Sequence, residues 1–432
     1  MTPQSTFMIT ATVDSGRQQA LETLLSSMNE APGFANPRNT LVPFWQFSRL
    51  HVARFTLLQA LTNDDIKGHG VAPSSWPTTL CFIGDIDGDV ATFLAELVIR
   101  AEPGLREIFS HCKEFDSGSD KLLDWLQAHS HRSAANYVNW RGRTVRQIHE
   151  EQALSEALGQ EVRRIATQDM NNRQIWRHLK RFTQARIETS QLSLTAPPAA
   201  TFGWRLRNLC HLIGIPLLLL ALFPVLLLCS PLYFWRLRAL ERSDPENMHR
   251  AERDHLRSLS VQEDVDVTNH FNVFGQVKPG ALRQFTIRMG LLLLDYTSRH
   301  IYTRGYLTRI QTIHFARWVL LDKGRRVYFA SNYDGSADSY MDDFINKVAW
   351  GLNLVFSNGV GYPRTRWLLK GGAEHEQKYK KTLRRNQLPS QCWYKAYPGL
   401  TAIDLARNSR IRQGLECETP SDAQLRTWLA LL

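Results

Sequence analysis

A nine-residue segment that occurs twice constrains this chain more than any other feature of its sequence. The segment LHVARFTLL at residues 50–58 returns as IHFARWVLL at residues 313–321, with five of nine positions identical. Each copy predicts a strand, because it is short, mostly apolar and rich in β-branched and aromatic residues. Internal repeats determine how other motifs are interpreted, since matched residues are expected at matched places in the fold.

Three further segments repeat in the same order around this one. FMITATVDSG at residues 7–16 parallels FNVFGQVKPG at residues 271–280, and each predicts a strand, a turn and then a helix. LCFIGDIDG at residues 80–88 parallels VYFASNYDG at residues 327–335, and each predicts a strand ending in Asp-Gly before a helix, at about 90–100 and 336–354. Tyr137-x-x-Trp140-x-Gly142-x-Thr144 parallels Tyr394-x-x-Tyr397-x-Gly399-x-Thr401 as a last strand and its exit. The main length difference is an insertion in the first copy, at about residues 59–77.

The order in each half is strand, helix, strand, strand, helix, strand, which is the ferredoxin-like plan. We therefore predict an α+β protein with a ferredoxin-like unit at residues 1–150, a helical connector at 151–265 and a second unit at 266–432. Such a sheet carries helices on one face and needs cover on the other. The two units are expected to cover each other, sheet to sheet, as an α+β barrel within one chain.

The connector contains 24 residues without a charge, from Leu212 to Trp235, with arginines and aromatic residues at both ends. A soluble helix rarely has no polar face, so membrane embedding is favoured over a buried core helix. One helix of this length, about 36 Å, would span a bilayer. Two units that pack together within one chain must lie on the same side of the membrane. This condition favours a hairpin bent at Pro224 over a single spanning helix. The alternative is a true span, with halves that pair between chains.

The net charge of +11 predicts a partner with negative charge. Anionic lipid headgroups are favoured, and the basic segment 364–385 is either their docking surface or a solvated helix face. Nucleic acid is disfavoured, because no nucleic-acid fold signature accompanies the charge. A homo-oligomer is another option. The six cysteines show no disulfide framework, and no cleavable signal peptide is visible, so we expect both units on the cytoplasmic side of a bacterial-type inner membrane or its equivalent.

The paired units resemble the dimeric α+β barrel superfamily, which includes dye-decolourising peroxidases. Those peroxidases carry a GxxDG motif, and residues 84–88 match it literally, whereas residues 331–335 lack the leading glycine. The resemblance implies that Asp87 and Asp334 assist peroxide cleavage beside a haem. The alternative is that each aspartate caps the following helix and each glycine permits the turn.

The repeated strand supplies the other candidate residues, His51 and Arg54 with their counterparts His314 and Arg317. An arginine inside an apolar strand needs a partner, so we expect the ion pairs Arg54–Asp87 and Arg317–Asp334. Under the resemblance, one histidine would be an axial haem ligand and an arginine–aspartate pair would act on the peroxide. The motif that supplies the haem histidine in those peroxidases does not occur here.

Two functions follow from these patterns. The first is a membrane-attached oxidoreductase, peroxidase-like, that acts on a hydrophobic or lipid-derived substrate. The second is a non-catalytic protein that binds a lipid or other ligand, or acts as a scaffold, at the membrane surface. Nucleotide hydrolysis and serine-based acyl transfer are disfavoured because their motifs do not occur, and no metal site is predicted.

Overall fold

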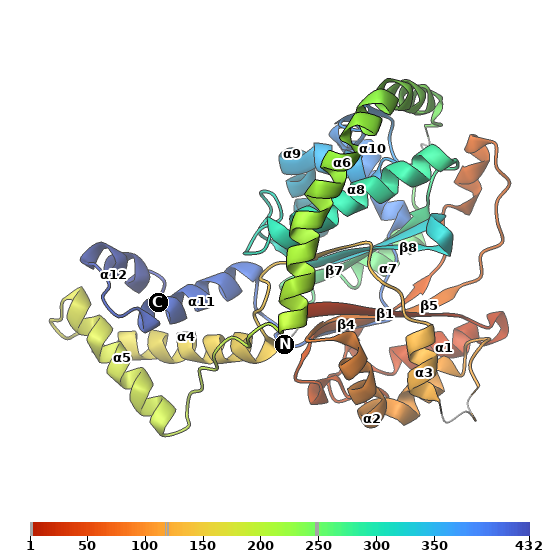
Figure 1. The fold of residues 1–432 in the computed structure, drawn as a ribbon. Helices are drawn as coiled ribbons and strands as arrows, with labels where there is room; N and C mark the ends of the chain where they lie inside the picture. Colours follow the sequence, from red (N-terminus) through yellow and green to blue (C-terminus); the bar gives the residue numbers. More distant parts are fainter. Residues whose placement is uncertain (1–2, 117, 119–120, 247–249) are drawn as a thin grey trace.

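The computed structural model describes residues 3–116, 118, 121–246 and 250–432 (Figure 1). The four repeated segments form strands of nine, nine, nine and four residues in both halves. The first half contains β1 (Gln4–Thr12), β4 (Leu50–Leu58), β5 (Thr79–Asp87) and β6 (Ala135–Val138). The second half contains β7 (Thr268–Gln276), β8 (Ile313–Leu321), β9 (Arg326–Asp334) and β12 (Cys392–Lys395). The α+β class is confirmed, and the repeated segments form strands of matching length in the two halves.

The last strand of each half belongs to the sheet of the other half. The first sheet has the order β1-β5-β4-β12-β3-β2, where β2 is Asn29–Ala31 and β3 is Phe34–Ala35, and the second has the order β6-β8-β9-β7. Trp393 thus lies opposite Arg54, and Asn136 lies opposite Arg317. The prediction that each half completes its own sheet is wrong. Both sheets offer an equivalent edge, and a strand's own sequence does not specify which edge it joins.

The two sheets face each other across a layer of buried apolar side chains from both halves. This layer contains Met8, Leu58 and Ile83 from the first sheet, and Phe274, Val319 and Tyr328 from the second. Helices α1 (Gln18–Ser26), α2 (Val90–Phe109) and α3 (Leu122–Ala128) cover the outer face of the first sheet (Figure 1). Helices α8 (Ala281–His300), α9 (Ala337–Phe356) and α10 (Glu376–Asn386) cover the second.

A separate helical arm joins the two halves beyond the sheets, at the left of Figure 1. Its helices are α4 (Val145–Ile165), α5 (Asn172–Glu188), α11 (Ala402–Glu416) and α12 (Asp422–Leu429), which share one apolar core. Helices α4 and α11 begin alike, at the threonines Thr144 and Thr401, each in a capping box. The repeat therefore extends beyond the sheets. The remaining elements are η1 (Ser15–Arg17), η2 (Phe44–Gln46), η3 (Asn63–His69), α7 (Arg253–Ser260), η4 (Asp322–Gly324), β10 (Thr365–Arg366), β11 (Lys370–Gly371) and η5 (Gly372–Glu374).

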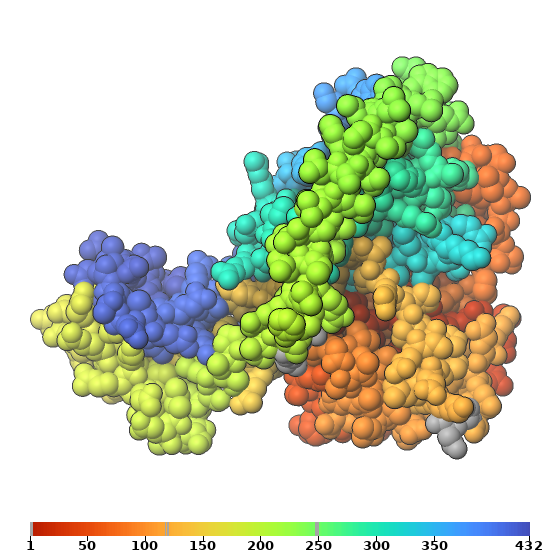
Figure 2. Space-filling model, in the orientation of Figure 1, coloured from red at the N-terminus to blue at the C-terminus, as the bar shows by residue number. Residues whose placement is uncertain are grey.

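The apolar segment lies in one continuous helix of 42 residues, α6 (Phe202–Ser243), which Figure 2 shows running across the surface. The helix is long and apolar enough to cross a membrane, and its most apolar part is not buried. The hairpin expected at Pro224 is wrong for this structure, because Pro216, Pro224 and Pro231 all lie inside the helix. An apolar environment tolerates such prolines, since neighbouring groups and small helical adjustments satisfy the freed backbone groups.

Both ends of the apolar segment contact α8 in the second half. At one end, Tyr296 donates a hydrogen bond to the Leu212 carbonyl at 3.1 Å, and His211 lies 2.9 Å from His300. At the other end, the hydroxyls of Tyr233 and Thr286 are 2.9 Å apart. The segment is therefore attached to one folded unit at both of its ends.

Candidate functional site

The two predicted histidines occupy equivalent and unusual positions. In each half the strand pairing shifts register at the histidine, between Leu50 and Val52 and between Ile313 and Phe315. A β-bulge of this kind turns a side chain away from the regular alternation. His51 Nε2 lies 3.0 Å from the carboxylate of Asp87, and His314 Nε2 lies 2.6 Å from that of Asp334. The repeat therefore brings together histidine and aspartate in both halves.

Each aspartate also accepts a hydrogen bond from the first turn of an arm helix. The N–H of Val145 at the start of α4 donates to Asp87 at 2.9 Å, and the N–H of Ala402 at the start of α11 donates to Asp334 at 2.7 Å. Burial alone would raise the pKa of Asp334, but His314, Ala402 and Thr268 together hold it below its usual value. A carboxylate is favourable at a helix N-terminus. The expected capping role is therefore correct in kind, but it serves α4 and α11, whereas Asp89 and Ser336 cap the helices that follow.

Tyr397 lies between the two histidine–aspartate pairs. Its hydroxyl is 3.2 Å from His51 Nδ1, and its ring centre is 6.3 Å from that of His314. Burial raises the pKa of Tyr397 well above its usual value. A cavity of about 20 Å³ borders all three side chains, which is room for roughly one water molecule.

A haem does not fit these residues. The cavity beside them, of about 20 Å³, is far smaller than the roughly 300–1,000 Å³ of an ordinary ligand pocket. Both ring nitrogens of His51 already have hydrogen-bond partners, and His51 and His314 are only 1% and 2% exposed. Within the described ranges, no group of three or more His, Cys, Asp or Glu side chains could hold a metal ion. A catalytic or cofactor-binding role for these residues stays a prediction, and their burial favours a structural role.

The two predicted arginines cross from one sheet to the other. Arg317 pairs with Asp85, and Arg54 donates to Asn272 at 2.8 Å and to Asn332. Asp85 and Asn332 are equivalent positions in the repeat, so the arginine meets a carboxylate on one side and an uncharged amide on the other. The expected pairs Arg54–Asp87 and Arg317–Asp334 are wrong. Each arginine projects across the gap between the sheets. The aspartate of its own unit, Asp87 or Asp334, is instead bonded to the histidine of that unit.

The second half contains an apolar cavity of about 110 Å³ between its sheet and its helices. Phe271, Trp318 and Phe329 form its floor on strands β7, β8 and β9, and helices α8 and α9 form its walls. Helix α9 departs from helical geometry at Val348, which lines this cavity, and Trp350 beside it is exposed. Sequence reasoning missed this site. The run of four leucines at residues 291–294 on α8 is the sequence signal that could have indicated it.

Comparison with protein-family models, with curated proteins and with solved structures finds no match for this chain.

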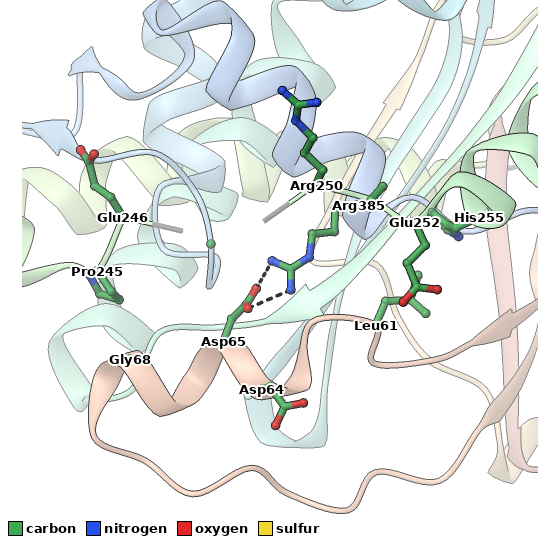
Figure 3. Close-up of a pocket in the computed structure, with 12 residues that line it drawn as sticks. Leu61, Asp64, Asp65, Gly68, Pro245, Glu246, Arg250, Glu252, His255 and Arg385 are labelled. Carbon is green, nitrogen blue, oxygen red and sulfur yellow. Dashed lines mark hydrogen bonds and ion pairs between the residues drawn. The ribbon is translucent and has the colours of Figure 1, made fainter. Parts of the chain in front are cut away.

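A polar cleft of about 640 Å³ lies between η3 on one side and residues 245–246 and 250–255 on the other (Figure 3). Arg385 on α10 also lines the cleft, and it contacts Asp65 on η3 at 2.6 and 2.9 Å. Four carboxylates line the cleft against two arginines and one histidine, so it offers no excess of positive charge. This arrangement makes it unsuitable for an anion.

The basic segment 364–385 is also less positive than its sequence suggests. Four of its cations pair with carboxylates, namely Lys378 with Glu246, Lys380 with Asp342, Arg384 with Glu263 and Arg385 with Asp65. Arg366 and Lys370 remain exposed, beside exposed Trp367. The expectation that this segment docks on anionic lipid stays a prediction, with fewer free charges to support it.

Proposed function

We propose that this chain is a membrane-attached protein that binds a hydrophobic ligand, such as the hydrocarbon chain of a lipid, between α8 and α9. The apolar cavity of the second half carries this proposal. Its lining is aromatic and aliphatic apart from the hydroxyls of its threonines and tyrosines and the ring N–H groups of its two tryptophans. Concave apolar sites with few polar groups are the usual places where small hydrophobic molecules bind.

The kink in α9 supports entry of a ligand from the side. Val348 has φ −148° and ψ 31°, and Gly351 follows one turn later on the cavity wall. Helix α8 approaches α9 closely there: a Cβ atom at Gly290 would lie only 3.2 Å from the Leu354 carbonyl oxygen. A small movement of the α9 segment after Val348 would widen the cavity, which now holds only a short stretch of hydrocarbon.

Membrane attachment rests on α6 together with the outer side of α8. Helix α6 is apolar on all sides through its central turns. Helix α8 adds Phe285, Met289 and Leu293, which are four residues apart and exposed, so they form one stripe. Since both ends of the apolar segment contact α8, we propose that α6 and this stripe enter the same lipid layer. The cavity behind α8 would then lie close to its source of ligand.

Each half is best described as a ferredoxin-like unit that has exchanged its last strand. The equal strand lengths, the histidine at the same bulge and the face-to-face sheets support this proposal. A distant relation to the dimeric α+β barrel superfamily is consistent with these features. Peroxidase-like chemistry is the weaker candidate, because His51 and His314 offer no room for haem. The purified protein is therefore expected to be colourless, whereas a Soret absorption band would favour the oxidoreductase.

Ligand binding is tested with a fluorescent fatty acid and the full chain in detergent. Leu294→Trp places a large ring in the cavity and is expected to weaken binding about tenfold or more. The matched control is Leu293→Trp, because Leu293 is the next residue of α8 and is 49% exposed. Equal affinities of both variants and the native protein would refute the proposed site.

A further inference from the structure

A third cavity, of about 530 Å³, lies where the first turns of α6 meet the end of α8 and helices α4 and α11. This junction is at the lower end of α6 in Figure 1. Five arginines and two glutamates line the cavity, which leaves an excess of three positive charges. The arginines are Arg141, Arg143, Arg299, Arg304 and Arg412. Neither the repeat nor the apolar site accounts for this concentration of charge.

Two of these arginines carry buried donors without an acceptor. Arg143 is 6% exposed; it lies 4.0 Å over the ring of Trp140, donates from Nη1 to the Leu405 carbonyl at 2.8 Å and has Glu151 at 3.6 Å from its Nε. Arg412 is 7% exposed and donates from Nε to Glu416 at 2.8 Å. Among the described residues, Arg143 Nη2 and Arg412 Nη1 meet no hydrogen-bond partner. Leaving a buried charged donor unsatisfied is costly, so these groups favour an anion in the cavity.

Backbone contacts hold two further arginines at the cavity rim. Trp140 and Arg304 pair as an isolated β-bridge, and the Arg141 N–H donates to the Thr303 carbonyl at 3.2 Å. Within the described part of the chain, neither side chain forms an ion pair, and Arg141 Nε has no acceptor. Burial lowers the pKa of Arg141 to about 10, so it remains charged at neutral pH. The first half and the second half therefore each contribute, from a backbone that these contacts hold, a guanidinium available to a ligand.

The repeat shows that the turn before the helix does not itself require these arginines. Arg141 and Arg143 correspond to Pro398 and Leu400 in the second half, where the following helix starts in the same way. The equivalent turn thus forms without a cation at either position. The arginines are a property of this end of the molecule, beside the start of α6.

We propose that this cavity binds a phosphate monoester, carried either by a lipid headgroup or by a soluble molecule. The planar guanidinium group matches phosphate oxygens with two parallel hydrogen bonds, and several arginines together compensate a doubly charged group. Trp204 on α6 borders the cavity, as an aromatic residue at a membrane interface does. The proposal does not rest on the apolar cavity, although residues 297–304 contribute to the walls of both cavities.

Calorimetric titration of the detergent-purified full chain with three probes tests the proposal. The probes are dioctanoyl phosphatidic acid, dioctanoylglycerol, which lacks the phosphate, and inorganic phosphate. Arg304→Gln removes an exposed cavity arginine without a protein partner, and it is expected to weaken phosphatidic acid binding about tenfold, as loss of a charged hydrogen bond does. Arg309→Gln is the matched control, because Arg309 is exposed on the same loop outside the cavity lining.

The titrations with these probes and variants distinguish a lipid from a soluble source of phosphate, and the basic cavity from the apolar one. Tighter binding of phosphatidic acid than of inorganic phosphate, with sensitivity to Arg304→Gln alone, assigns the site to a lipid headgroup. Equal binding of inorganic phosphate with the same sensitivity assigns it to a soluble phosphate. Failure of phosphatidic acid and phosphate to bind, or equal losses in the Arg304 and Arg309 variants, overturns the proposal. Leu294→Trp affects only the hydrocarbon site, so failure of one proposal leaves the other testable.

Discussion

At the scale of single residues, the buried polar groups between the sheets distinguish the two halves. Arg317 has a carboxylate partner, Asp85, whereas Arg54 is held by the amides of Asn272 and Asn332 and by the carbonyls of Phe271 and Ser331. Burial lowers the pKa of Arg54 to about 10, so it stays charged at neutral pH. A buried cation without a carboxylate depends on every acceptor around it.

The Asp85→Asn variant tests the value of this ion pair. The variant places an asparagine opposite Arg317, as Asn332 already lies opposite Arg54. Arg317 then stays buried beside an uncharged amide. Breaking a buried pair is expected to lower the free energy of unfolding by about 3 kcal/mol. Chemical denaturation in detergent measures the change. Asp64→Asn, in an exposed pair with Lys67, is the control and is expected to have almost no effect. An equally small effect of Asp85→Asn would mean that Arg317 finds another acceptor.

At this scale the repeat predicted that histidine and aspartate recur at matched places, but it did not predict their contact, because arginine was expected as the partner of each aspartate. Histidine and aspartate repeat together in each half, and the structure brings them together. The arginine contacts cross between units, and the sequence of one unit does not identify its partner in the other. The arginines of the basic cavity lie far apart along the chain, at 141–143, 299–304 and 412, so no local pattern connects them.

At the scale of elements, α6 combines a sequence that contains three prolines with one uninterrupted helix of 42 residues. Three prolines each remove one backbone hydrogen bond, yet the helix continues from Phe202 to Ser243. The length and apolarity of the segment were predictable from composition. Its continuity as one helix was not, because a proline inside an apolar run can either end a helix or be accommodated within it.

Distance measurement between spin labels tests this continuity in lipid. Labels at Arg205→Cys and Arg242→Cys, both at exposed positions of α6, are expected about 55 Å apart, since 37 residues rise by about 1.5 Å each. A hairpin at Pro224 would bring them within about 20 Å. Labels at Arg205→Cys and Leu217→Cys are the control, because about 18 Å is expected for either arrangement. A short distance for the first pair would show that lipid bends the helix.

At the scale of the whole molecule, the exchanged strands make the two halves inseparable. Strand β12 completes the first sheet and β6 completes the second, while the arm packs α4 and α5 against α11 and α12. The repeat was predictable from the sequence, because its four segments keep their order and local pattern. The exchange was not, because β4 and β8 present equivalent edges to two similar strands.

A protease site inserted after Ser190 tests this interdependence. Ser190 is exposed in the turn after α5, so cleavage there should leave the fold intact. The two fragments are expected to purify together and to separate only in denaturant, because strand pairs and a shared helical core join them. A second protease site after Asp116, within a loop of the first half, is the control for effects of cleavage alone. Fragments that separate spontaneously would show that the exchange contributes little to their association.

The exchange also sets the order of events while the chain is being synthesised. Strand β4 ends at Leu58, and its partner β12 begins at Cys392, more than 330 residues later. At roughly 5–20 residues per second, the ribosome needs on the order of 20 s to a minute to deliver that partner. Throughout this interval the nascent first sheet presents an open edge, which is a template for pairing with other chains. We therefore expect the partly synthesised chain to be prone to aggregation through this edge until β12 is complete, at a stage when α6 has already emerged.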